Sequence, residues 1–274
     1  MIGQDRAMIA DEAQIVLPAG AGSDWTVPQH WDRYTASDHR TWVTLYERQS
    51  AVLPSRACDA FLRGLEALDL HGSGIPDFER LSERLRALTG WSVVAVPGLV
   101  PDDVFFDHLA NRRFPAGNFI RRPDQLDYLQ EPDVFHDVFG HVPMLTDPTF
   151  ADYMQAYGEG GRRAFSLGQL AHLARLYWYT VEFGLLQTPD GIRIYGAGIV
   201  SSRAESIYAL ESPIPRRIDF DLERVMRTPY KIDEVQALYF VAPSLKFLLH
   251  ATQDTDFGPL YAYLVRTPDL ALEL

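Results

Sequence analysis

The sequence predicts a single, mainly α-helical domain with a few short β strands. Apolar residues recur at helical spacing over most of the chain, whereas the β-rich runs are few and short. The 274 residues allow two small domains or one large one, and no segment of about 20 to 50 residues is repeated. We expect residues 1–30, rich in glycine, proline, serine and aspartate, to be a poorly ordered lead-in. Residues 31–265 would form the single domain and residues 266–274 a C-terminal tail.

Helices dominate the predicted elements between residues 37 and 111. Apolar stripes mark three amphipathic helices, a β-branched run marks a strand, and a proline marks the first turn of a fourth helix. The helices cover residues 37–48, 56–68, 75–89 and 101–111, and the strand covers residues 91–96. The third helix is bounded by Pro76-Asp77 and by Gly90, as helix starts and stops commonly are.

The rest of the chain predicts a longer helix and a β-hairpin. Residues 114–129 contain proline and glycine and are interpreted as loops, as are residues 158–163. Ser202 and Glu205 have the spacing of a capping box at the start of a helix. Helices are predicted from residue 131 toward 140 and over residues 165–184, 243–252 and 257–265, and strands over residues 185–187, 192–195 and 237–240.

The composition excludes several classes of protein. Cys58 is the single cysteine, so no intrachain disulfide can form, which is typical of a reducing compartment. Acidic residues outnumber basic ones by 37 to 25, and a nucleic-acid-binding protein usually has the opposite excess. No apolar run reaches the roughly 18 residues of a transmembrane helix, and the first residues include acids where a signal peptide needs an apolar core. We therefore expect a cytoplasmic protein whose partner is neither a membrane nor a nucleic acid.

Two histidines five residues apart, His136 and His141, are candidates for metal chemistry. On a straight α-helix five residues turn about 500°, which leaves these side chains about 140° apart. Gly140 permits a break, and Pro143 disfavours helical geometry at the residue before it. We therefore expect His136 on a helix and His141 just past its end, where the two rings could converge on one ion. Both could instead be helix-capping or core histidines.

A third candidate ligand is Glu182, the only acid between Glu159 and Asp190. It lies in an aromatic and aliphatic run, where a carboxylate is costly to bury unless it is paired or bound to a metal. Two histidines and a carboxylate form the facial triad of non-haem Fe(II) oxygenases, which leaves coordination positions open for oxygen. Glu182 could instead pair with an arginine such as Arg175. A zinc hydrolase with the same ligands is a weaker alternative, because the H-E-x-x-H spacing is missing.

Three separated blocks of sequence resemble one family in the same order along the chain. The blocks are residues 131–145, 176–186 and 195–202, and the resemblance extends over residues 42–264. The chain resembles the pterin-dependent aromatic amino acid hydroxylases, most closely their short bacterial members that act on phenylalanine. The resemblance implies a monooxygenase that converts L-phenylalanine to L-tyrosine. Its cofactors would be Fe(II) and a tetrahydropterin such as tetrahydrobiopterin, with O2 as co-substrate.

The resemblance also implies a role for each matching position. The iron ligands would be His136, His141 and Glu182. The substrate site would contain Arg121, Ser201, Asp133, Trp178 and Phe183. The pterin pocket would contain Gly98, Leu99, Val100, Phe105 and Tyr177. In this scheme Arg121 grips the substrate carboxylate through its planar fork and Asp133 holds Arg121 in place.

The chain departs from the animal members of the family at Asp137, where they carry glutamate, and we assign this residue no role. Neither a regulatory domain nor an oligomerising helix fits in the chain, so we expect a monomer. The resemblance links its function to a pterin carbinolamine dehydratase. Trp178 matches the phenylalanine and tyrosine enzymes better than the tryptophan enzymes, and hydroxylation of tyrosine or tryptophan stays an alternative. A non-catalytic amino acid binding protein is a further one.

Overall fold

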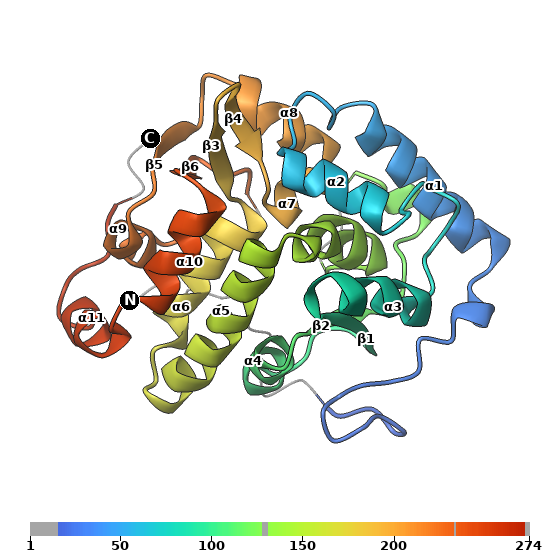
Figure 1. The fold of residues 1–274 in the computed structure, drawn as a ribbon, viewed down its shortest axis with the longest axis horizontal. Helices are drawn as coiled ribbons and strands as arrows, with labels where there is room; N and C mark the ends of the chain where they lie inside the picture. Colours follow the sequence, from blue (N-terminus) through green and yellow to red (C-terminus); the bar gives the residue numbers. More distant parts are fainter. Residues whose placement is uncertain (1–15, 128–130, 233, 272–274) are drawn as a thin grey trace.

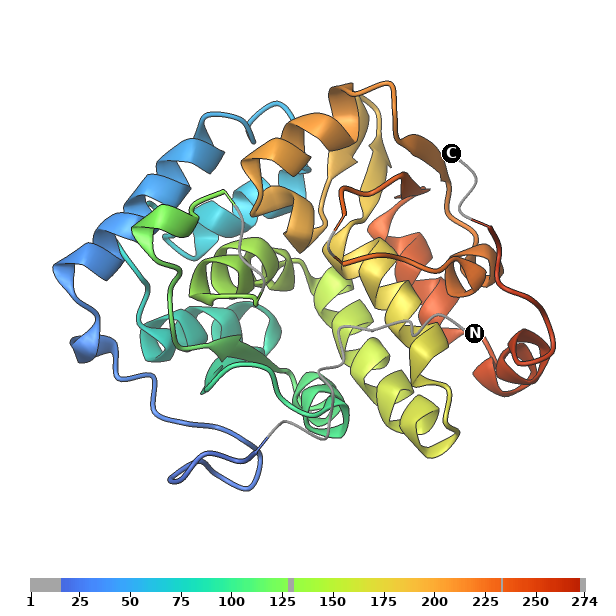
Figure 2. The ribbon, with the colours of Figure 1, turned by 180° about the vertical axis from the view of Figure 1, so that it is seen from behind.

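The computed structural model describes residues 16–127, 131–232 and 234–271, which fold mainly into helices with a few short strands, as the sequence predicts. Elements of the N-terminal half lie on one side of the molecule and those of the C-terminal half on the other (Figures 1 and 2). The long helix α5 (Pro148–Ser166) runs between them. Buried apolar residues from both sides form one continuous core, so the two halves share a single interior.

The N-terminal half packs helices around a small parallel sheet. Its elements are α1 (Ala36–Ser50), α2 (Asp59–Ala67), α3 (Phe78–Thr89), β1 (Ser92–Val96), α4 (Asp102–Ala110) and β2 (Arg113–Gly117), with a 3₁₀ turn, η2, at Trp31–Arg33. Thr35 and Asp38 form a reciprocal capping box on α1, and Gly90 ends α3 in the left-handed conformation at φ 79°. Since α4 connects the parallel strands β1 and β2, the loop after β1 and the start of α4 lie at one edge of this unit.

The C-terminal half contains a mixed sheet in the order β4-β3-β6-β5. Its strands are β3 (Leu185–Thr188), β4 (Gly191–Ile194), β5 (Arg216–Asp219) and β6 (Leu238–Ala242). The predicted hairpin is confirmed, since β3 and β4 pair in antiparallel fashion around Pro189 and Asp190. The helices are α6 (Leu170–Tyr177), α7 (Ala197–Val200), α8 (Arg203–Glu211), α9 (Leu222–Arg227), α10 (Leu245–Gln253) and α11 (Phe257–Leu264). Ser202 caps α8 by accepting from the Glu205 amide, while the Glu205 carboxylate accepts from the Tyr239 hydroxyl.

The predicted loop at residues 158–163 is wrong, and the predicted helix over 165–184 is confirmed only over residues 170–182. Residues 158–163 lie inside α5, which ends at Ser166, and α6 begins only at Leu170 after Gly168 turns at φ 66°. The glycines that suggested a loop serve helix packing instead. A Cβ on Gly158 would lie 2.3 Å from the Ala110 backbone nitrogen, so α5 contacts α4 more closely than any larger residue would permit.

Residues 113–117 form strand β2 where the sequence suggested a loop. Pro115 and Gly117 are uncommon in strands, yet β2 has β1 as its one partner in the two-stranded sheet and needs fewer amide donors than a central strand. Pairing with β1, rather than local sequence preference, accounts for the extended conformation.

The two flanks of the expected domain also contact it. Residues 1–15 of the expected lead-in lie outside the described residues, whereas the Val27 amide donates to the Ala95 carbonyl of β1 at 2.9 Å. In the tail, the Asp269 carboxylate pairs with Arg175 of α6 at 2.6 Å. Of the helices that the structure describes, none is long and apolar enough to cross a membrane.

Candidate active site

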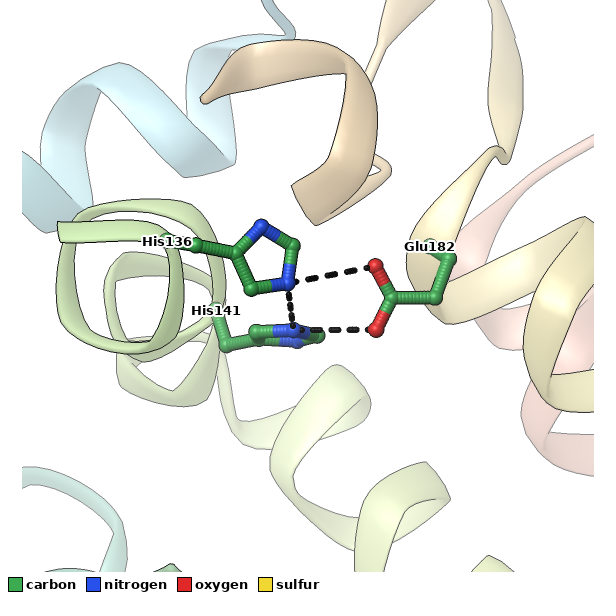
Figure 3. A group of neighbouring side chains, drawn as sticks. All are labelled: His136, His141 and Glu182. Atoms are coloured by element: carbon green, nitrogen blue, oxygen red, sulfur yellow. Dashed lines mark hydrogen bonds and ion pairs between the residues drawn. The ribbon is translucent and has the colours of Figure 1, made fainter. Parts of the chain in front are cut away.

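A π-helix brings His136 and His141 together. The segment η4 (Phe135–His141) is a π-helix that continues into the 3₁₀ turn η5 (Val142–Thr146). In a π-helix each amide bonds to the carbonyl five residues back, so residues five apart lie close to one face. The Nε2 atoms of the two histidines are 3.3 Å apart (Figure 3). The expected convergence is therefore confirmed, but the expected helix break is wrong, because His141 is the last residue of the wide helix.

Glu182 comes from a second π-helix on the opposite side of the site. The segment η6 (Trp178–Glu182) continues α6 and ends at this glutamate. Its Oε1 lies 3.1 Å from His141 Nε2 and its Oε2 lies 3.5 Å from His136 Nε2. One ligand atom from each of the three side chains lies within 4.8 Å of the others. The alternative pairing with Arg175 is wrong, since Arg175 bonds to Asp269.

The protonation of this cluster suits a divalent cation. Burial lowers the pKa of His136 to about 4, so its ring is neutral. Burial alone would raise the pKa of Glu182, but the nearby His141 and His136 outweigh it and the pKa is lowered. The neutral imidazole of His136, the imidazole of His141 and the carboxylate of Glu182, whose ligand atoms point at one another, form the donor set of a metal site.

Ser201, at the end of α7, determines which nitrogen of His136 is available. Its hydroxyl donates to the Ala197 carbonyl at 2.7 Å and therefore accepts from His136 Nδ1 at 3.0 Å. This assignment puts the imidazole proton on Nδ1 and leaves Nε2 free to face Glu182. The close approach of α7 to η4 depends on Gly140, where a Cβ would lie 3.0 Å from the Ala197 carbonyl oxygen.

A mostly apolar cavity opens beside the three ligands. It is lined by His136, His141 and Glu182 together with all five residues predicted for the pterin pocket, Gly98, Leu99, Val100, Phe105 and Tyr177. Phe105 of α4 meets Tyr177 of α6 edge to face, with ring centroids 5.7 Å apart. Residues from β1, α4 and α6 therefore converge on one cavity.

Arg121 and Asp133 form a buried ion pair next to His136. Arg121 donates from Nε and from Nη2 to the two carboxylate oxygens of Asp133, each at 2.8 Å. Burial acts to raise the pKa of Asp133, but the bonds from Arg121 outweigh it and the pKa is lowered. Because Asp133 also accepts from the His136 amide at 3.0 Å, the arginine is fixed to the start of the helix that carries His136, as expected.

Comparison with known proteins identifies the family. Residues 26–254 match the model of the biopterin-dependent aromatic amino acid hydroxylases. The chain belongs to this family. It is 69% identical to the phenylalanine-4-hydroxylase of Caulobacter vibrioides over 255 residues, covering 93% of this chain and 86% of that protein. It is 62% identical to the Chromobacterium violaceum phenylalanine-4-hydroxylase over 242 residues, covering 88% of this chain and 81% of that protein.

The fold of this hydroxylase agrees with solved structures of the C. violaceum enzyme. The structure with bound oxidised Fe(III) has a TM-score of 0.89 at 58% identity and covers 95% of this chain and 93% of that one. The structure with iron and phenylalanine bound has a TM-score of 0.88 at 56% identity, covering 95% and 94%.

The predicted substrate residues of this hydroxylase lie around the cavity rather than in its apolar lining. Ser201 and the Arg121–Asp133 pair reach it through bonds to His136. Trp178 lies against Phe183 with ring centroids 4.6 Å apart, and its indole Nε1 donates to Gln236 at 2.9 Å. Among the described residues, these five are absent from the cavity wall next to the ligands, and their contact with substrate stays a prediction.

Ten described residues that line the cavity of the hydroxylase were not predicted for the site, among them Tyr157, Leu170 and Asp137. Tyr157 lines the cavity from α5, just before the glycines that were interpreted as a loop, and Leu170 lines it from the start of α6. Asp137 also lines the cavity, where it accepts from the Gly117 amide at 2.8 Å and burial raises its pKa to about 7. Its position next to His136 was the sequence signal that could have placed it there.

Proposed function

We propose that this hydroxylase is a phenylalanine 4-monooxygenase that converts L-phenylalanine to L-tyrosine with O2 and a tetrahydropterin. The observation that carries the proposal is the convergence of His136, His141 and Glu182 at the cavity that also collects the five pterin-pocket residues. Relatives that bear this activity in their names are as much as 69% identical to the chain.

His136, His141 and Glu182 would hold Fe(II) as a facial triad. When bound, the iron and the pterin together supply the activation of O2 that no amino acid side chain can provide. The protein contributes ligand orientation, because Ser201 fixes the ring of His136 and the two π-helices fix the facing directions of the ligands. It also excludes bulk water through the aromatic walls of the cavity.

The remaining residues would position the two organic molecules. The guanidinium of Arg121 would bind the amino acid carboxylate with Asp133 fixing its orientation, and Ser201 would add a hydroxyl. Trp178 and Phe183 would contact the aromatic ring of the substrate. Phe105 would stack on the pterin, with Tyr177 beside it and the backbone of Gly98, Leu99 and Val100 along its edge.

An oxygen-uptake assay tests the proposal. The purified protein is given Fe(II), a tetrahydropterin and, in turn, phenylalanine, tyrosine and tryptophan, and products are identified by mass. We expect tyrosine from phenylalanine, with O2 and pterin consumed together. Oxygen consumption without tyrosine would refute the substrate assignment, and turnover with zinc in the absence of oxygen would refute the reaction class. Glu182→Ala should abolish hydroxylation.

The cellular setting is part of the same proposal. The protein would be a cytoplasmic monomer, and a carbinolamine dehydratase would remove water from the hydroxylated pterin that it releases. Light scattering on the purified chain tests the monomer. Steady-state turnover at limiting pterin, with an added reductant that returns the dehydrated pterin to the tetrahydro form, is measured with and without the dehydratase. The functional link predicts faster turnover when the dehydratase is present.

A further inference from the structure

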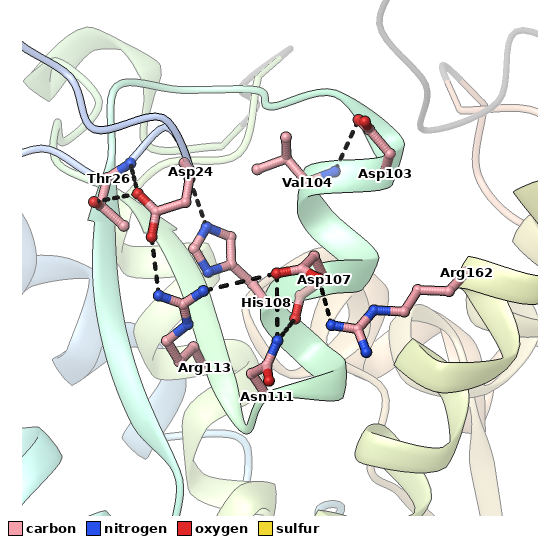
Figure 4. Close-up of polar contacts among 9 residues, drawn as sticks. All are labelled: Asp24, Thr26, Asp103, Val104, Asp107, His108, Asn111, Arg113 and Arg162. Carbon is pink, nitrogen blue, oxygen red and sulfur yellow. Dashed lines mark hydrogen bonds and ion pairs between the residues drawn. The ribbon is translucent and has the colours of Figure 1, made fainter.

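The segment of residues 22–27, called here the N-terminal segment, crosses the outer side of the β1–α4–β2 unit (Figure 4). The Val27 amide donates to the Ala95 carbonyl of β1 at 2.9 Å, and the Asp24 carbonyl accepts from His108 Nε2 of α4 at 2.8 Å. The segment therefore joins the strand and the helix.

The side chain of Asp24 fixes the shape of the segment and attaches it to β2. Its carboxylate accepts from the Thr26 hydroxyl at 2.6 Å and from Arg113 Nη1 at 2.9 Å. Arg113 also directs Nη2 toward Asp107 of α4, at 3.9 Å. Asp24 thus bonds directly to α4 through His108 and to β2 through Arg113, and its segment bonds to β1 through Val27.

The same unit forms the pterin side of the cavity. Val96 of β1, residues 98–100 and Asp102 and Phe105 of α4 all line it. Phe105 and His108 are three residues apart on α4, so a shift of the helix at His108 also moves the ring of Phe105. The position of this wall therefore depends on the contacts that hold α4 in place.

His108 is bound in its neutral form. Its ring is completely buried and, among the residues that the structure describes, Nδ1 has no hydrogen-bond partner. Protonation would place a second N–H at that buried atom without an acceptor. Burial lowers the pKa of His108, and Arg113 acts in the same direction, whereas the carboxylates of Asp24 and Asp107 act to raise it. The net direction favours the neutral ring that donates to Asp24.

We propose that Asp24 and His108 are positioning residues for the pterin side of the cavity, because together they hold the N-terminal segment against α4. The inference rests on the proposed function. It extends that function to residues that touch neither cofactor nor substrate. Because attachment requires neutral His108, it is complete above the ordinary pKa of 6.5 and weakens as the pH falls below that value.

The test measures the KM for the tetrahydropterin and kcat for tyrosine formation in variants of the full chain. His108→Leu removes the donor and Asp24→Ala removes the side-chain contacts. We expect each to raise the pterin KM about fivefold, the scale of one hydrogen bond, with kcat within about twofold. His108→Gln keeps a donor that can reach the Asp24 carbonyl and should restore the KM. Arg162→Gln is the matched control. It breaks only the exposed pair between Arg162 of α5 and Asp107 of α4, the helix that also carries His108.

A pH series separates positioning from general stability. From about pH 7.5 to about pH 5.5 the wild-type pterin KM should rise more than that of His108→Gln, which cannot titrate. Cobalt(II) binding, followed by its absorption spectrum, should be the same in all variants. If His108→Leu does not fold, Asp24→Ala and the ratio of wild-type to His108→Gln KM decide the question. An unchanged pterin KM in His108→Leu and Asp24→Ala would overturn the inference. So would a ratio of wild-type to His108→Gln pterin KM that does not vary with pH. A wild type that binds no pterin would instead refute the proposed function.

Discussion

Ser201 connects His136, a proposed metal ligand, to the backbone of α7 and so decides the tautomer of its ring. Replacement by alanine removes the acceptor for Nδ1–H and lets the ring rotate or change tautomer. We expect Ser201→Ala to bind Fe(II) about tenfold more weakly, measured by metal titration under anaerobic conditions. The neighbouring Ser202→Ala is the control, because it removes the cap of α8 and costs about 1 kcal/mol of stability without touching the ligand. Equal metal affinity in wild type and Ser201→Ala would contradict this role.

Among the described residues, Asp133 is the one carboxylate to which Arg121 donates hydrogen bonds, and both side chains are buried. Asp133→Asn leaves the arginine charge buried without a counter-charge, which should cost about 3 kcal/mol of unfolding free energy. The KM for phenylalanine should rise as well, because the guanidinium loses its fixed orientation. Urea unfolding and steady-state kinetics measure the two effects. Asp124→Asn, which breaks the exposed Arg122–Asp124 pair, should change neither. An unchanged phenylalanine KM in Asp133→Asn would refute the orienting role.

At the level of single residues, chemistry was easier to predict than contacts. Two histidines and an isolated acid in an apolar run were candidates for a metal site by their types, although capping or core roles and an arginine pair stayed open. The bond from Ser201 to His136 and the cavity position of Asp137 depend on how α7 and β2 pack against η4. Those contacts join residues distant in sequence, and no local pattern contains them.

Among the helices, α5 shows how packing can override local preference. Gly158 faces α4, where a Cβ would lie 2.3 Å from a backbone nitrogen, whereas a Cβ on Gly160 would meet nothing within 4 Å. We expect Gly158→Ala to lower the unfolding free energy by about 2 kcal/mol through overpacking. Gly160→Ala, on the same helix, should raise it by about 0.5 kcal/mol through better helix propensity. Urea unfolding measures both, and a similar response from the two variants would show that close contact is not what requires glycine at position 158.

The helices and strands with clear sequence signals were predicted well. The stripe and caps of α3 and the turn of the β3–β4 hairpin are local features, and the structure has them at or near the predicted residues. The π-helices η4 and η6 have no such signal, because the extra residue in each turn is stabilised by the packing around the site rather than by propensity. The 3.6-residue period of an α-helix therefore predicted that His136 and His141 point in different directions. A break in the helix was then needed to bring their rings together.

In the whole molecule, both chain flanks contact helices that line the cavity. The family match covers residues 26–254, whereas Asp24 and the tail around Asp269 lie outside it. Asp24 reaches α4, which carries Phe105, and Asp269 reaches α6, which carries Tyr177 and continues to Glu182. The cavity is thus enclosed by the matched region and contacted at two places by segments that lie outside residues 26–254.

The tail contact has a defined pH dependence. Arg175 is 5% exposed and donates to both carboxylate oxygens of Asp269, which lowers the pKa of that carboxyl. A lowered pKa means that the contribution is present above the ordinary value of 3.8 and is lost as the pH falls below it. Asp269→Asn should therefore lower the unfolding free energy at about pH 7 by about 1 kcal/mol, a value kept small because the Asp269 side chain is 45% exposed.

The difference between wild type and Asp269→Asn should shrink when urea unfolding is repeated at about pH 3, where the wild-type carboxyl is protonated in the unfolded chain. Asp254→Asn is the control, since it removes an exposed partner of His250 on α10 and should leave stability unchanged. Because α6 leads into η6, loss of the tail contact should also weaken Fe(II) binding, a change that the control cannot produce. A stability difference that stays constant between the two pH values would show that the charge on Asp269 does not hold the tail to α6.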